Sequence, residues 1–164
     1  MRVISNVLLF FLLLSSGCYS FKGTSISPDV KTFYVKVFEN KAPNVVPTLS
    51  IEFTEALRNK IRNESRLIYN DAEPDVEFSG IISDYRVSYV APQAGETTAF
   101  NRLEIAVKVD YVNNKNQKEN WTNTFKFFND FATTENLLNV QDDLIKNINK
   151  QLVEDIFNKA FTNW

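Results

Sequence analysis

Hydrophobic residues recur along the chain with two periods, one typical of strands and one typical of helices. Residues 31–38 alternate between apolar and polar faces, with Phe33, Val35 and Val37 on one side, which predicts a strand. Residues 48–63 carry apolar groups three and four positions apart, which predicts a helix that starts at Thr48 as its N-cap. Residues 39–46, between these two elements, have no such period and are expected to form a loop.

Three more strands are predicted in the middle of the chain. Residues 76–89 alternate, but their apolar positions change parity near Ser83 and Asp84, which predicts one long strand with a bulge. Residues 103–111 alternate most regularly, and residues 121–127 place Trp121, Phe125 and Phe127 on one face. The aperiodic residues 90–98 and the polar residues 113–118 should therefore connect two successive hairpins, the first with a projecting loop.

A long amphipathic helix is predicted at the end of the chain, capped by Thr133 or Thr134. Its apolar stripe consists of Leu137, Leu144, Ile148, Leu152, Ile156 and Ala160. The predicted order is strand, helix, strand, strand, strand, helix, and every element is apolar on one side. We therefore expect an α+β fold, a two-layer sandwich in which a four-stranded mixed sheet carries both helices on one face.

The first seventeen residues have the pattern of a signal that is removed. Arg2 precedes an apolar run too short to span a bilayer, and three small residues stand directly before Cys18. This pattern resembles the lipobox of bacterial lipoproteins, so Cys18 is expected to carry a diacylglycerol and an acyl chain such as palmitate. The alternative is an ordinary secretory signal with an incidental cysteine. We expect a signal peptide at 1–17, a tether at 18–29 and one α+β domain at 30–164.

Composition removes most catalytic chemistry. Among 164 residues there is no histidine and only one cysteine, which excludes Ser-His-Asp and Cys-His catalysis and histidine-containing zinc sites. The acidic pairs Asp142–Asp143 and Glu154–Asp155 lie between apolar helix positions, so we interpret them as a solvated helix face. The chain is thus predicted to be non-enzymatic, with no cofactor and no metal ion.

Net charge argues against a nucleic-acid partner. The formal net charge is -2, and removal of Arg2 with the leader makes the remainder slightly more acidic. Proteins that bind nucleic acid without sequence preference carry a basic surplus. No nucleic-acid partner is expected.

Candidate binding residues lie around the loop of the first predicted hairpin. Arg102 follows Asn101 where the loop re-enters the sheet, and an arginine at such a place can hold a phosphate or a carboxylate with two hydrogen bonds. Pro92 and Gln93 lie in the loop itself. The alternative for Arg102 is an ordinary surface charge at a strand end.

Aromatic residues make up 13% of the chain, more than one covered sheet face needs. Aromatic side chains that point outward would form an apolar partner surface. The alternative is a thick core with aromatic side chains at its rim. The residues in question are Tyr34, Phe38, Tyr85, Tyr89 and the aromatic residues of the run from Phe125 to Phe131.

Several short motifs, in order along the chain, resemble those of the LptE family. They are Cys18-Tyr19-Ser20-Phe21-Lys22-Gly23, Pro47-Thr48-Leu49-Ser50, Phe53-Thr54-Glu55-Ala56-Leu57, Tyr85-Arg86-Val87, Phe100-Asn101-Arg102-Leu103, and Leu152 to Ala160 with Asn163-Trp164 at the end. The resemblance implies a lipoprotein on the periplasmic side of the outer membrane. It also implies that this lipoprotein plugs and helps to assemble the large β-barrel LptD, and that it binds lipopolysaccharide.

The family's basic contact residues cannot be placed one by one in this sequence, so Pro92, Gln93, Asn101 and Arg102 are our own candidates. A rival interpretation is an auxiliary lipid-binding lipoprotein of an ABC-type lipid trafficking system. An outer-membrane hydrolase is disfavoured because the chain has no histidine and no GxSxG motif.

Overall fold

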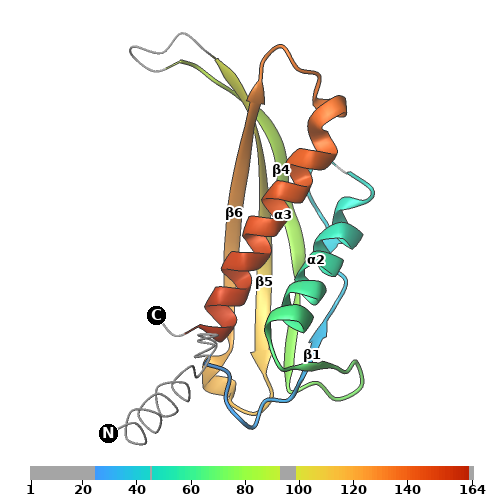
Figure 1. Cartoon of the computed structure of the whole chain (residues 1–164), viewed down its shortest axis with the longest axis vertical. Coiled ribbons are helices and arrows are strands. Elements are labelled where there is room, and N and C mark those ends of the chain that lie inside the picture. The colour runs from blue at the N-terminus through green and yellow to red at the C-terminus, as the bar shows by residue number, and fades with distance from the viewer. Residues whose placement is uncertain (1–24, 45, 93–98, 163–164) are drawn as a thin grey trace, which may run out of the picture.

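A computed structural model describes residues 25–44, 46–92 and 99–162. One mixed sheet is covered on one face by two helices, whose axes run along the length of the sheet (Figure 1). The elements, in chain order, are β1 (Thr32–Val35), β2 (Glu39–Asn40), α2 (Leu49–Glu64), β3 (Ile68–Tyr69), β4 (Val76–Val90), β5 (Phe100–Asn113), the 3-10 helix η2 (Gln117–Glu119), β6 (Trp121–Ala132) and α3 (Leu137–Phe161).

The sheet follows the order β3-β1-β4-β5-β6, and β2 pairs with β4 beyond the end of β1. The short strands pair in parallel with their neighbours, whereas β4, β5 and β6 form an antiparallel meander. The prediction of an α+β fold with a mixed sheet is confirmed, but the prediction of four strands is wrong. The two additional strands have two residues each, which is too short for an alternation to appear in the sequence.

The predicted bulge in the first long strand is confirmed. The β4–β5 register shifts between Ile82 and Asp84, so that Ile82 lies opposite Val107 while Tyr85 lies opposite Ile105. One extra residue in β4 therefore returns the apolar side chains to the covered face after the change of parity. This bulge keeps the long strand continuous up to Val90.

Both predicted helical stripes form the layer over the sheet. On α2 the buried residues include Leu49, Phe53, Leu57 and Ile61, and on α3 they include Leu144, Ile148, Leu152 and Ile156. Thr48 occupies the N-cap of α2 without a side-chain cap bond. Asn136, and not Thr133 or Thr134, caps α3 by accepting a hydrogen bond from the Leu138 N–H. Neither of these helices is apolar enough to cross a bilayer.

The predicted alternation of residues 31–38 is wrong at its end. Phe33 and Val35 are fully buried, but Val37 is 61% exposed and Phe38 is fully buried. The chain leaves β1 after Val35, and Phe38 then packs edge-on against Phe53 at a ring distance of 5.0 Å. Gly80 of β4 makes room for Phe38, because a Cβ at that position would lie 2.7 Å from its ring.

Candidate functional site

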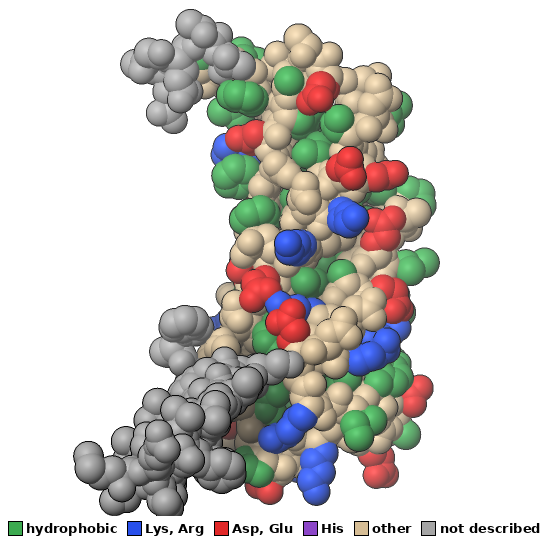
Figure 2. Space-filling view, in the orientation of Figure 1, with side chains coloured by type: hydrophobic (Ala, Val, Ile, Leu, Met, Phe, Trp, Pro, Cys, Tyr) green, Lys and Arg blue, Asp and Glu red, His purple; other side chains and the backbone are tan. Residues whose placement is uncertain are grey.

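Exposed apolar side chains gather at the end of the sheet where β4 and β5 join. Among the described residues, five of the nine exposed large hydrophobic side chains lie here, and Figure 2 shows apolar side chains on this upper part of the molecule. We call this region the hairpin end and define it by Val87, Tyr89, Phe100, Phe128 and Leu138, together with the ion pair of Arg102 and Asp130. Such a group of apolar residues is typical of a partner or ligand surface.

Arg102 is held in place by two neighbours on β6. Its Nε and Nη2 donate to the two carboxylate oxygens of Asp130 at 2.7 and 2.8 Å, and its guanidinium lies 3.5 Å from the centre of the Phe128 ring. The hydrogen bond from Arg102 lowers the pKa of Asp130, and the same bond raises the pKa of Arg102. A guanidinium has five N–H donors, and Asp130 uses two of them. A phosphate or carboxylate ligand would bind to a cation that is already oriented.

The four candidate binding residues do not share one face. Pro92 is exposed just beyond the end of β4, and Gln93 lies outside the described residues. Asn101 lies opposite Tyr89 and Phe131, on the helix-covered face, whereas Arg102 lies opposite Ser88 and Asp130 on the open face. Successive side chains of a strand point to opposite faces, which separates Asn101 from Arg102. Cys18 also lies outside the described residues.

The sequence alone does not identify Asp130 and Phe128 as partners of Arg102. Both lie on β6, and Asp130 is 28 residues from Arg102 in the sequence. Only the β5–β6 register places Arg102 opposite Asp130. The sequence signal that could have located them is the alternation of the last strand. Phe128 and Asp130 fall on the face of that strand opposite to Trp121, Phe125 and Phe127.

The aromatic residues divide between the core and the surface. Phe38, Tyr85, Phe125 and Phe131 are buried, whereas Tyr89 and Phe128 are exposed. The thick core therefore accounts for most of the aromatic content. The exposed aromatic residues of β4, β5 and β6 lie at the hairpin end.

The open face of the sheet is polar, and three of its cations pair with carboxylates, whereas Lys108 and Lys126 have no ion pair among the described residues. Lys36 pairs with Glu77 at 3.1 Å, Arg86 with Glu104 at 2.5 Å and Arg102 with Asp130 at 2.7 Å. Opposite charges across neighbouring strands stabilise a sheet modestly and leave a face that water or another polar surface can cover. This face carries little net charge.

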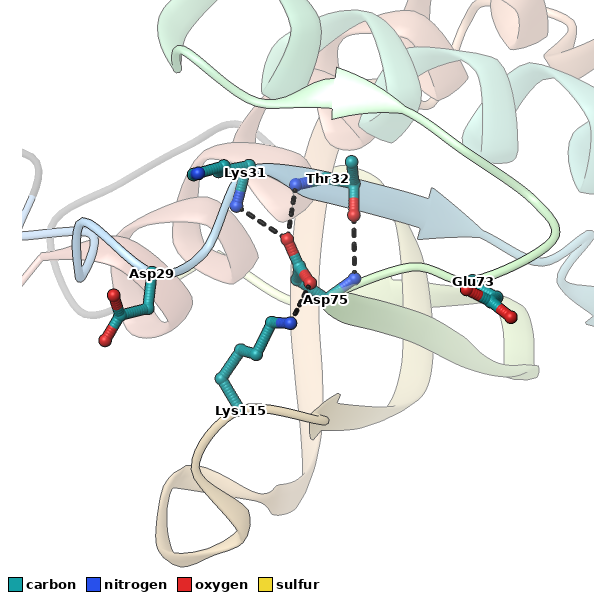
Figure 3. A pocket seen from close by; sticks show the side chains of 6 residues that line it. All are labelled: Asp29, Lys31, Thr32, Glu73, Asp75 and Lys115. Atoms are coloured by element: carbon teal, nitrogen blue, oxygen red, sulfur yellow. Dashed lines mark hydrogen bonds and ion pairs between the residues drawn. The ribbon is translucent and has the colours of Figure 1, made fainter.

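A pocket at the other end of the sheet is centred on Asp75 (Figure 3). The backbone N–H groups of Lys31 and Thr32 donate to Asp75 Oδ2 at 2.8 and 3.0 Å, and Lys115 pairs with its Oδ1 at 3.0 Å. The hydrogen bond from Lys31 is the largest of the contributions that lower the pKa of Asp75 to about 2. Because both carboxylate oxygens are engaged within the protein, we interpret this pocket as a structural clamp.

A groove between α2 and α3 is lined mostly by residues with polar side chains. Lys60 of α2 pairs with Glu64 at 2.7 Å and with Glu154 of α3. Burial opposes the charge of Lys60, but the hydrogen bonds to Glu154 and Glu64 outweigh burial and raise its pKa. The amide oxygen of Asn149, which also lines the groove, is buried without a partner among the described residues. We interpret this groove as the seam between the two helices.

Comparisons with known proteins agree with this architecture. A family model described as LptE, lipopolysaccharide-assembly, matches residues 30–160. A search of curated proteins finds no match.

Three solved structures have a similar fold. A minor lipoprotein from Acinetobacter baumannii superposes with a TM-score of 0.52 at 11% identity, covering 81% of this chain and 97% of that one. Lipoprotein B from Nitrosomonas europaea superposes with a TM-score of 0.51 at 12% identity, covering 78% of this chain and 80% of that one. PelC from Paraburkholderia phytofirmans, solved as a dodecamer, gives 0.52 at 10% identity, with coverages of 87% and 94%. At these identities the likeness shows the fold alone.

Proposed function

Because the chain belongs to the LptE family of lipopolysaccharide-assembly proteins, we propose that it is a non-enzymatic lipoprotein on the periplasmic side of the outer membrane. In this proposal it plugs a large LptD-type β-barrel and assists the assembly of that barrel. It also binds lipopolysaccharide during insertion into the outer leaflet. The family match over residues 30–160 is the observation that carries the proposal.

The open face of the sheet supports the role of a plug. The lumen of a large outer-membrane barrel is polar, and such barrels are often filled by a separate element. On this face the arginines are held by neighbouring carboxylates, in the pairs Arg86–Glu104 and Arg102–Asp130, so they can enter a polar lumen without becoming buried unpaired charges.

The hairpin end supports the binding of lipopolysaccharide. Lipopolysaccharide combines acyl chains with phosphate groups, and on the open face the hairpin end combines exposed Phe100 and Phe128 with the oriented guanidinium of Arg102. Covering apolar side chains with acyl chains lowers the free energy of the complex, and a guanidinium binds phosphate in a fixed geometry. We therefore assign lipopolysaccharide contact to this end of the sheet.

Copurification tests the partner. Affinity capture of the tagged full chain from a detergent extract is expected to bring down a very large β-barrel, and depletion of the chain should impair assembly of that barrel. The alternative function, an auxiliary lipoprotein of an ABC-type lipid trafficking system, predicts recovery of an inner-membrane transporter instead. Recovery of the transporter without the barrel would replace the proposed function by the alternative.

Binding of fluorescent lipopolysaccharide tests the hairpin end. The double variant Phe100→Ser and Phe128→Ser is expected to bind about tenfold more weakly, because roughly 1–2 kcal/mol of apolar contact is lost. The control is Val37→Ser with Ile68→Ser, which removes two apolar side chains that are exposed elsewhere on the molecule. Equal binding by both double variants would remove the hairpin end from the proposal. For the cation, Arg102→Ala is compared with Arg86→Ala, a second paired arginine of the open face.

A further inference from the structure

The strand β6 forms an unpaired edge of the sheet. It pairs with β5 through 12 consecutive residue pairs without a register shift, and its other side has no strand partner in the described chain (Figure 1). The opposite edge is different, because it ends in β3, a strand of two residues. Proteins usually protect a sheet edge with short strands, bulges, proline or charged side chains; β6 is long and has no bulge and no proline, and of these devices it carries only the charges of Lys126 and Asp130.

The backbone groups that β6 leaves unpaired belong to its even-numbered residues. The N–H of Ala132 donates to the Glu135 carboxylate at 3.2 Å, and its C=O accepts from the Glu135 N–H at 3.0 Å. Both backbone groups of Ala132 therefore point away from β5. In an antiparallel pair, alternate residues direct both backbone groups to the same side. The same orientation therefore applies to Thr122, Thr124, Lys126, Phe128 and Asp130. Within residues 25–44, 46–92 and 99–162, no group bonds to their outward backbone.

The charged side chains of β6 are complementary to those of the same strand in a second copy. If two copies pair antiparallel about a two-fold axis at Phe128, each Lys126 lies directly opposite Asp130 of the other copy. An axis at Lys126 would instead oppose Lys126 to itself. An axis at Phe127 would place Lys126 opposite the uncharged Phe128, and an axis at Phe125 would place it opposite the uncharged Thr124. Directly opposite unlike charges stabilise a strand pair, and like charges destabilise it. Lys126 is exposed and has no ion pair in the described chain, so it is available for this contact.

We infer that the free protein forms a symmetric dimer in which two β6 edges pair antiparallel about Phe128 and join the sheets of two copies. A closed β-barrel has no free strand edge, so the wall of a barrel does not supply this partner. A second copy offers the same exposed edge with the complementary charge pattern. The inference concerns the free protein and does not rest on the proposed function.

Charge exchange between copies tests the dimer and its register. The two-fold axis creates two contacts, each between residue 126 of one copy and residue 130 of the other. In the variant Lys126→Asp each contact brings two carboxylates together, and in Asp130→Lys each brings two ammonium groups together. Each alone should weaken the dimer at least about tenfold in sedimentation velocity of the full chain in detergent. An equimolar mixture of the two variants should restore the dimer, because both contacts then pair unlike charges. The matched control is Lys108→Glu, an exposed charge on the central strand β5.

Cross-linking gives an independent readout of the two-fold axis. In a Cys18→Ala background, oxidised Phe128→Cys should form a disulfide dimer, because facing residues of a strand pair lie within disulfide reach. Thr124→Cys, four residues from the axis, should not. A parent chain that is monomeric at all concentrations, a mixture that fails to dimerise, or equal cross-linking at both positions would overturn the inference.

Discussion

At the residue scale, Asp75 ties together three segments of the chain. Its carboxylate accepts from two backbone groups at the start of β1 and from Lys115 after β5, and its own N–H donates to Thr32 Oγ1 at 2.9 Å. Charge-assisted hydrogen bonds of this kind are stronger than neutral ones. A single carboxylate therefore fixes the end of the sheet that lies away from the hairpin end.

The variant Asp75→Asn is expected to lower the free energy of unfolding by about 2 kcal/mol at neutral pH, because the charge-assisted bonds are lost. The pKa of Asp75 falls from 3.8 to about 2 in the folded protein. Its contribution is thus fully present above about pH 4 and is lost as the pH falls toward 2. Urea unfolding of parent and variant should show a difference that shrinks in acid.

The control for this experiment is Asp71→Asn, which changes an exposed carboxylate in the nearby turn. It should leave the unfolding curve within about 0.5 kcal/mol of the parent. A difference between Asp75→Asn and the parent that stays constant down to pH 2 would show that the carboxylate charge is not the origin of the effect.

At the element scale, α3 joins the two layers of the protein. Its apolar stripe packs on β5 and β6 and also on α2, and the side chain of Ile148 at its centre is fully buried. A helix in this position derives most of its stability from the packed face and not from its local sequence.

A charge on the buried stripe should therefore be costly. Ile148→Asp is expected to destabilise the fold by about 4 kcal/mol or more, because an unpaired carboxylate would replace a buried hydrocarbon. Thermal unfolding followed by circular dichroism measures the change. The neighbouring exposed variant Asn147→Asp serves as the control, and equal stability of the two variants would mean that the helix face is misassigned.

At the scale of the whole molecule, the start of the described chain and the hairpin end lie at opposite ends of the long axis (Figure 1). The N–H of Ser25 donates to the carbonyl of Phe161 at 2.7 Å, which fixes the first described residue beside the end of α3. A lipid anchor on Cys18 would thus attach the protein to the membrane at the end remote from its candidate ligand surface.

The anchor itself is open to test. Cys18→Ala is expected to move the protein out of the membrane fraction or leave it uncleaved, because the thiol that would carry the lipid is missing. Two or three acyl chains bind a membrane stably, whereas a single chain does not. Membrane fractionation and the mass of the purified protein are the measurements, and Ser20→Ala is the matched control. Normal fractionation and unchanged mass of the Cys18 variant would exclude lipidation.

Sequence patterns predicted the order of the main elements, the bulge in β4 and both helical stripes. These features depend on local periodicity, because a residue's face in a strand or helix follows from its spacing to near neighbours. Composition alone disfavoured histidine- and cysteine-based catalysis. The motifs quoted from the sequence were sufficient to suggest the LptE family, which the family match then confirmed.

Only the tertiary structure decided which distant residues meet. The register of β5 and β6 places Asp130 against Arg102, and the parallel pairing of β1 with β4 brings Asp75 to the backbone of Lys31. The two-residue strands and the burial of Phe38 likewise depend on neighbours elsewhere in the chain. Register, edge exposure and long-range ion pairs arise from the packing of whole elements, and no local pattern of apolar and polar residues records them.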